Sequence, residues 1–98
     1  MANYEDDGSR IRGMARDPRC RFLYTRHAEH ELRQDSIAKL HVENMLRRCR
    51  VTLSEDKGGE LTHRAEGTDG DGRHIAVVVV MYQEEILIKV ISGWASKK

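Results

Sequence analysis

Residues 69–80 read DGDGRHIAVVVV, and this stretch decides the fold because a turn signal leads directly into the most apolar run of the chain. Glycine adopts the positive φ that a tight reversal needs, so the acid–glycine pairs predict a turn. A run that is apolar on both faces is typical of a central strand. We therefore expect a strand over residues 73–82, with Arg73 and His74 at its polar end on opposite faces of the sheet.

Shorter strand patterns flank this central run on both sides. RVTLS (50–54) and LTHRAEG (61–67) precede it and are separated by the turn DKGGE, and ILIKVISGW (86–94) follows it after the turn QEE. The segment 61–67 alternates in polarity, as a half-buried strand does. Short turns between consecutive strands predict a four-stranded antiparallel meander.

Two helices are expected before the sheet. TRHAEHELRQDS (25–36) places Ala28 and Leu32 on one face, and Asp35 or Ser36 can cap a second helix over residues 38–48. The second helix carries an apolar stripe at helical spacing, formed by Val42, Met45, Leu46 and Cys49. Two helices that cover one face of four antiparallel strands make an α+β fold.

The first 20 residues are expected to form a flexible basic arm ahead of a single domain over residues 21–98. They lack hydrophobic periodicity and contain the only proline, Pro18. The net charge of the 98-residue chain is +1, but residues 10–50 hold eleven Lys or Arg against five Asp or Glu. Such a block can attract phosphate, although ordinary solvated helix faces are the alternative. The candidate RNA-binding residues are Arg10, Arg12, Arg16, Arg21 and Arg64.

Composition argues against several classes of protein. The longest apolar run, residues 75–82, is too short to cross a bilayer, and the N-terminus has no secretory signal pattern. Cys20 and Cys49 lie in no metal-ligand spacing and indicate reduced thiols. Metal binding is possible from His27, His30 and Glu31, but these residues fit no H-E-x-x-H pattern and do not make a convincing set of three ligands. We expect a cytoplasmic protein with no membrane association, no metal site and no cofactor.

A few polar side chains are candidates for chemistry. His27 and Glu31 are one helical turn apart, so the carboxylate can orient the imidazole or can form a routine helix-surface contact. Lys89 is the only charge within ILIKVIS. Histidine suits proton transfer near neutral pH, and cations stabilise the phosphorane formed during RNA cleavage. The candidate catalytic residues are His27, Glu31, Arg73, His74 and Lys89.

Two motifs carry a resemblance to a known family. HAEHELRQDSI (27–37) resembles the H-A-x-x-E-[ML]-x-x-D-x-I opening of the domain of unknown function 4258 family. RAEGTDGDGRHIAVVVV (64–80), followed by ILIKVISGW (86–94), is similar to that family's G-x-x-x-D-G-R-x-[IL]-x-V-V-V strand and its closing I-[IT]-V-[IY] strand. The resemblance covers about residues 22–94.

This resemblance implies a fold similar to the RelE and BrnT type toxins, with metal-independent ribonuclease activity in many relatives. The matching motif residues are His27, Glu31, Asp35 and Arg73. The chain departs from the pattern at Ala38, where a Ser or Thr cap is usual. It also departs at residues 92–94, where Ser-Gly-Trp replaces a closing tyrosine on which an active site could depend.

Two functions follow as expectations. The first is an endoribonuclease of toxin–antitoxin type, which cleaves RNA by general acid–base catalysis and has an antitoxin-like protein partner. The alternative is a non-catalytic binding or accessory module for protein or RNA, for which a homodimer is a candidate state. A fold hosts many functions, so the side chains of the site must decide between them.

Overall fold

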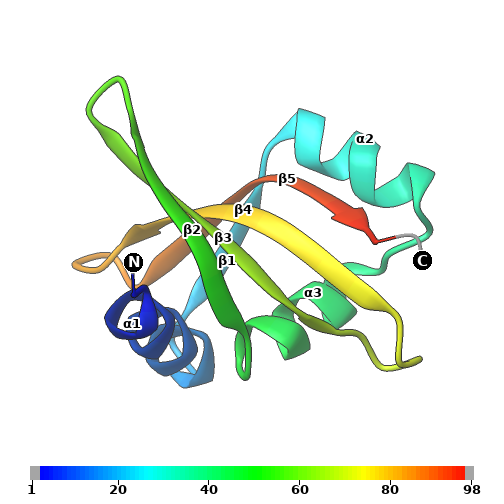
Figure 1. Cartoon of the computed structure of the whole chain (residues 1–98), viewed down its shortest axis with the longest axis horizontal. Coiled ribbons are helices and arrows are strands. Elements are labelled where there is room, and N and C mark those ends of the chain that lie inside the picture. Colours follow the sequence, from blue (N-terminus) through cyan, green and yellow to red (C-terminus); the bar gives the residue numbers. More distant parts are fainter. Residues whose placement is uncertain (1–2, 97–98) are drawn as a thin grey trace.

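The computed structural model describes residues 3–96 and has an α+β fold, with three helices and one five-stranded mixed sheet (Figure 1). The expected α+β class is therefore confirmed. In chain order the elements are α1 (Glu5–Arg16), β1 (Arg21–Tyr24), α2 (Arg26–Gln34), α3 (Lys39–Leu46), β2 (Arg50–Lys57), β3 (Glu60–Thr68), β4 (His74–Tyr82) and β5 (Leu87–Ala95). The strand order is β1-β5-β4-β3-β2.

The predicted meander forms the larger part of this sheet. Strands β2 to β5 pair antiparallel with their neighbours in the chain, and β4 lies between β3 and β5. Val77 is paired with Ala65 on one side and with Gly93 on the other. The turn before β4 closes through a 2.8 Å hydrogen bond from the Asp69 N–H to the Arg73 carbonyl, and Gly72 supplies a φ of +80°. The apolar run is thus the central strand.

A fifth strand makes the sheet mixed, which corrects the prediction of four antiparallel strands. Residues Arg21 to Tyr24 run parallel to β5, with Arg21 beside Leu87 and Tyr24 beside Val90. Four residues are too few to show a strand period. The pairing also joins opposite ends of the sequence, so local patterns carry no signal for it.

A flexible arm was predicted over residues 1–20, but much of this segment forms a helix. Residues 5–16 form α1, and Ile11 and Ala15 are at most 1% exposed within the main core. Three acids, Glu5, Asp6 and Asp7, occupy the first turn, where negative charge complements the helix dipole. With only two buried apolar side chains, this helix shows too narrow a stripe to be recognised in the sequence.

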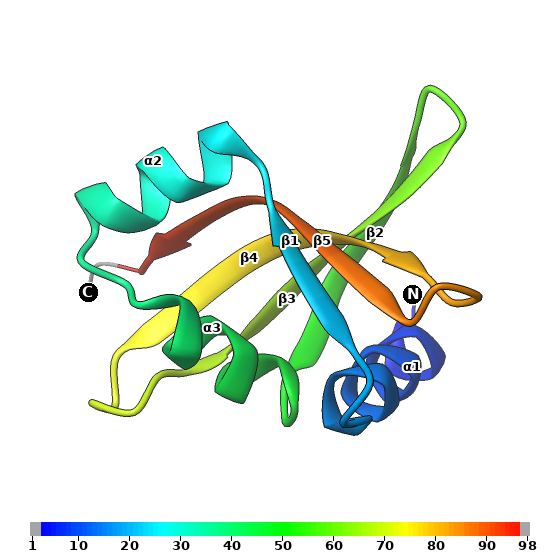
Figure 2. The same ribbon diagram turned by 180° about the vertical axis from the view of Figure 1, so that it is seen from behind.

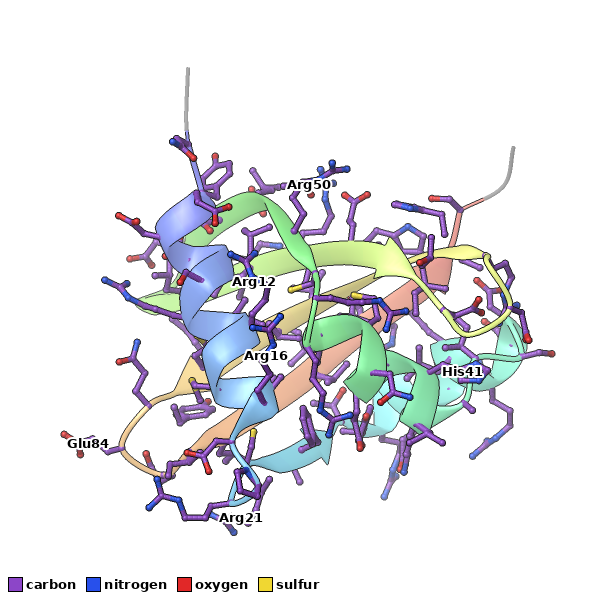
Figure 3. The ribbon with its side chains drawn as sticks, turned by 90° about the horizontal axis from the view of Figure 1, so that it is seen from below. Arg12, Arg16, Arg21, His41, Arg50 and Glu84 are labelled. Carbon is purple, nitrogen blue, oxygen red and sulfur yellow. The ribbon has the colours of Figure 1, made fainter. Side chains whose placement is uncertain are left out.

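The three helices share one hydrophobic core against one face of the sheet. Figure 3 shows α1 and α3 lying across the strands, and Figure 2 shows α2 beside β5 at the other margin. Val42, Met45 and Leu46 of α3 are fully buried, which confirms this part of the predicted stripe; Cys49 is only 2% exposed but lies after the end of α3, which is shorter than the predicted helix over residues 38–48. They pack with every second residue of β4, which are Ile75, Val77 and Val79. None of the described helices is long and apolar enough to span a membrane.

Helix capping differs from the prediction for α3. Thr25 caps α2 by accepting a 3.1 Å hydrogen bond from the Ala28 N–H. The N-cap of α3 is Ala38, which has no side-chain cap, whereas Asp35 is the C-cap of α2 and Ser36 has a φ of +56°. Asp35 and Ser36 therefore end the first of the two predicted helices and do not start the second.

Candidate functional site

The second face of the sheet, which we call the open face, carries no described helix. Its residues alternate with the core residues of each strand, so His74, Ala76 and Val78 of β4 lie on it. The buried apolar residues of the described helices all belong to the core on the other side. The register adds Arg64 and Glu66 from β3 to the open face.

A hydrogen-bonded network joins three strands on the open face. His74 Nε2 lies 2.7 Å from Glu66 Oε1, and Thr52 donates to Glu66 Oε2 over 2.6 Å. The Arg64 Nε–H group lies 2.9 Å from Thr52 Oγ1 and 3.1 Å from Glu66 Oε2. The network therefore fixes a histidine, a carboxylate and a guanidinium beside one another.

The protonation of Glu66 sets the tautomer of His74. Burial raises the pKa of Glu66, but hydrogen bonds from Thr52 and His74 and the charge of Arg64 outweigh it, so the pKa lies below its ordinary value. An ionised carboxylate only accepts hydrogen bonds, so His74 donates from Nε2. Nδ1 of the neutral ring then carries a free lone pair, and this atom has no hydrogen-bond partner among the described residues. His74 can accept a proton there.

Cations from four strands lie on the open face. Arg21 and Lys89 lie on it through the β1–β5 register, and Arg50 lies opposite Glu66 on β2. With Arg64 they form a set that we call the open-face cations. Figure 3 shows Arg21 and Arg50 at opposite margins of the molecule. Phosphate groups that follow the sheet surface would meet positive charge on several strands.

An aromatic side chain lies next to the histidine on the same face. Trp94 of β5 is paired with Ala76, two residues along β4 from His74. Ala76 is only 2% exposed although no described helix covers it, which shows that larger neighbouring side chains close over it. The indole ring of a half-buried tryptophan offers a stacking surface for a nucleobase.

Lys89, a predicted catalytic residue, lies farther along the open face. It is paired with Val80, and its Nζ is 5.6 Å from the Tyr82 ring centroid and 3.8 Å from Glu60 Oε2. Its partners are therefore separate from those of His74. The lysine can attract phosphate, but it shares no hydrogen bond with the His74 network.

Two motif acids of α2 satisfy the outer edge of β5. β1 pairs with β5 only as far as Val90. Beyond that point the Gly93 N–H donates to Glu31 Oε1 over 3.1 Å, and the Ala95 N–H donates to Asp35 Oδ2 over 2.8 Å. His27 lies 3.3 Å from Glu31 and its side chain is 67% exposed. The predicted His27–Glu31 pair exists, but its carboxylate is engaged in holding the sheet edge.

Arg73 joins the turn before β4 to the end of α2. Its Nε–H donates to Asp69 Oδ2 over 2.9 Å, and its two terminal nitrogens donate to the carbonyls of Asp35 and Ser36 over 2.7 and 3.0 Å. These carbonyls lie at the helix C-terminus, where a cation is favourable. The structure thus separates Arg73 from His74, and three structural acceptors surround its guanidinium.

The basic residues of α1 divide into two groups. Arg12 donates to the Cys49 carbonyl over 2.8 Å, and Arg16 donates to the Arg47 carbonyl over 2.8 Å, so both hold α1 against the segment after α3 (Figure 3). Arg10 is more exposed and lies 3.7 Å from Asp7. Of the predicted RNA-binding residues, Arg64 and Arg21 lie on the open face, whereas Arg12 and Arg16 are engaged elsewhere.

A buried histidine on the helix-covered face is part of a second polar chain. Ser54 Oγ lies 2.9 Å from Asp7 Oδ2 and 2.7 Å from His63 Nδ1. Burial lowers the pKa of His63; the charge of Asp7 opposes this effect and that of Arg10 adds to it. The order Asp–Ser–His is not that of a nucleophilic triad, in which the histidine lies between the other two.

Sequence reasoning missed Glu66 as the partner of His74 and Asp69 as the partner of Arg73. Glu66 and His74 are eight residues apart on different strands, and Asp69 and Arg73, although four residues apart, lie in a turn and not in a helix, so sequence spacing alone did not indicate either contact. The pairing of β3 with β4 brings Glu66 to His74, and the turn between these strands brings Asp69 to Arg73. Burial raises the pKa of Asp69, but hydrogen bonds from Arg73 and the Asp71 N–H outweigh it, so the pKa lies below its ordinary value.

Two cavities lined by described residues lie away from the His74 network. One of about 500 Å³ borders α2 and the segment before α3, and its lining includes Leu32, Ile37 and Lys39. Another of about 330 Å³ is lined by His63, Arg10 and others. Neither cavity is lined by His74, whose network lies on the open face of the sheet.

Comparison with protein-family models and with curated proteins finds no match to this chain. The resemblance to the domain of unknown function 4258 family therefore rests on the sequence motifs alone. The geometry of the open face carries the functional argument.

Proposed function

We propose that this protein is a metal-independent endoribonuclease of toxin–antitoxin type whose active site lies on the open face. The observation that carries the proposal is the 2.7 Å contact of His74 Nε2 with an ionised Glu66, which leaves Nδ1 free to take a proton. Arg64 adjoins this pair, and Trp94 lies on the same face. An antitoxin-like protein would inhibit the enzyme by covering this face.

The proposed reaction is transesterification of the RNA backbone. His74 Nδ1 removes the proton of a 2′-hydroxyl, and the oxygen attacks the adjacent phosphorus to form a 2′,3′-cyclic phosphate. The P–O5′ bond breaks, the 5′-oxygen takes a proton from water, and the His74 imidazolium gives its proton to the hydroxide that remains. Glu66 orients the imidazole and stabilises the imidazolium, while the Arg64 guanidinium stabilises the charge that develops on the phosphorane.

The test is cleavage of a defined single-stranded RNA by purified protein, free of any partner, with chelator present. We expect His74→Ala to lower the rate about 10²- to 10⁴-fold, the usual range for loss of a general base. Glu66→Gln keeps an acceptor for His74 but loses the charge, so its pH–rate profile should move to lower pH. His30→Ala, an exposed position on α2, is the matched control.

Three outcomes would count against the proposal. Cleavage that His74→Ala retains would remove His74 from the mechanism. Loss of activity in His27→Ala with a normal fold would instead favour the site predicted from the motif. No cleavage by the wild-type protein would favour the non-catalytic binding module, and RNA binding could then be measured directly as a function of salt.

A further inference from the structure

Another polar cluster on the helix-covered side, separate from the His63 chain, contains a buried ring nitrogen without a partner among the described residues. His41 lies on α3, and its Nδ1 is the one side-chain nitrogen or oxygen within residues 3–96 that is buried and makes no hydrogen bond. Buried polar atoms are almost always paired, so each exception needs an explanation. A bound ion is one such explanation.

Two carboxylates face this nitrogen from the turn between β3 and β4. Asp69 Oδ2 is 4.0 Å from His41 Nδ1, too far for a hydrogen bond, and Asp71 completes a group whose ligand atoms lie within 4.8 Å of one another. Figure 3 shows His41 beneath this turn. A Cβ at Gly70 would lie 3.3 Å from His41 Nε2, so the ring packs directly on the turn backbone.

The position of Asp69 is fixed independently of the histidine. Its side chain is fully buried, and Oδ1 accepts hydrogen bonds from the Asp71 and Arg73 N–H groups over 2.9 and 2.8 Å. Among the residues that the structure describes, only Arg73 Nε donates to Oδ2, which leaves a lone pair for a further ligand. One potential ligand is thus held in place before any ion binds.

We propose that His41, Asp69 and Asp71 bind a divalent first-row transition-metal ion. Two ligands that each lie about 2.0–2.2 Å from one ion are about 3.3–3.6 Å apart in a tetrahedral site, so His41 Nδ1 and Asp69 Oδ2, which are 4.0 Å apart, can share an ion after a small rotation of the partly exposed imidazole. Asp71 is exposed, so its carboxylate can turn toward the same ion. The imidazole nitrogen favours zinc, cobalt or nickel over magnesium and calcium. The Arg73 charge beside Asp69 limits the affinity.

Such an ion would tie α3 to the turn that precedes the central strand. The expected effect is stabilisation of the fold by binding to the native state. The proposed ribonuclease reaction involves no metal and uses the other face of the sheet. Metal binding is therefore independent of that function, and the two can fail separately.

The test uses the full chain without a histidine tag, stripped with chelator and returned to metal-free buffer. Co²⁺ is added and followed by visible absorption, and Zn²⁺ is added and followed by thermal unfolding. We expect one equivalent of Co²⁺ to bind and Zn²⁺ to raise the melting temperature. His41→Ala and Asp71→Asn should each weaken Co²⁺ binding at least about tenfold.

Asp71→Asn is the decisive variant, because Asp71 is exposed and the substitution should leave the fold intact. His30→Ala removes an exposed histidine of α2 and should bind Co²⁺ as the wild type does. The proposal is overturned if the wild type shows no saturable Co²⁺ absorption. It is also overturned if Asp71→Asn and His41→Ala bind Co²⁺ as tightly as His30→Ala.

Discussion

Replacement of Arg73 by alanine should destabilise the fold strongly, because the side chain holds three acceptors together. The ion pair with the fully buried Asp69 carboxylate is broken, and removal of one partner of a buried pair typically costs about 3–5 kcal/mol. The lower end applies here, since the Arg73 side chain is 36% exposed and Asp69 keeps two backbone donors. The carbonyls of Asp35 and Ser36 also lose their donors but can turn to water.

The expected loss in unfolding free energy is therefore about 3 kcal/mol. For a domain of this size that corresponds to a fall of roughly 12–24 °C in Tm. Arg73→Lys keeps the charge but cannot reach all three acceptors, so it should lose roughly 1–2 kcal/mol. Urea unfolding with chelator present, followed by the fluorescence of Trp94, the single tryptophan, measures both values.

Arg26→Ala is the matched control, because Arg26 is exposed at the start of α2. It should change the unfolding free energy by less than about 0.5 kcal/mol. If Arg73→Ala stays within the same limit, the structural role argued for this guanidinium is refuted. If that variant is stable and also loses RNA cleavage, the catalytic role predicted from the sequence is favoured instead.

Three further predictions concern packing and pH. Gly93→Ala should destabilise by about 1–3 kcal/mol, because the new Cβ would lie 2.7 Å from the Leu32 side chain, whereas Gly13→Ala in α1 meets nothing within 4 Å and should be neutral or stabilising in the same urea assay. Val77→Asp should prevent stable folding by burying an unpaired charge, while Val78→Asp, on the half-buried open face, should leave a folded protein by circular dichroism. The folded-state pKa of His63 lies below its unfolded value, so its contribution to stability is complete above about pH 6.5 and is lost as pH falls toward the folded pKa. His63→Gln should show a smaller loss of stability than the wild type between pH 7 and 5, and equal losses in the two proteins would contradict this assignment.

Several features of this fold follow from the sequence alone because they depend on local periodicity. Alternation and turn chemistry predict strands β2 to β5 and their antiparallel order, since short connections leave consecutive strands little choice of partner. The helical spacing of Val42, Met45 and Leu46 predicts the buried face of α3. The separation of Arg73 and His74 at the start of β4 also follows from the sequence, because successive side chains along an extended chain point to opposite faces.

The tertiary structure decided the rest, because those features depend on contacts between distant segments. β1 exists only through its pairing with β5, and α1 packs through a stripe too narrow to be seen in the sequence. The roles of the motif residues that carry the family resemblance also depend on contacts between distant segments. Glu31 and Asp35 hold the edge of β5, and Arg73 holds the end of α2.

The candidate site shows the same division. His74 was recognisable as a histidine at the mouth of a strand, but its chemistry depends on which group faces it. Glu66 does so only because β3 and β4 pair in one register, which brings its carboxylate within 2.7 Å of the ring. A sequence specifies which side chains are present and their local period, whereas the free nitrogen of His74 depends on a contact that exists only after the sheet has formed.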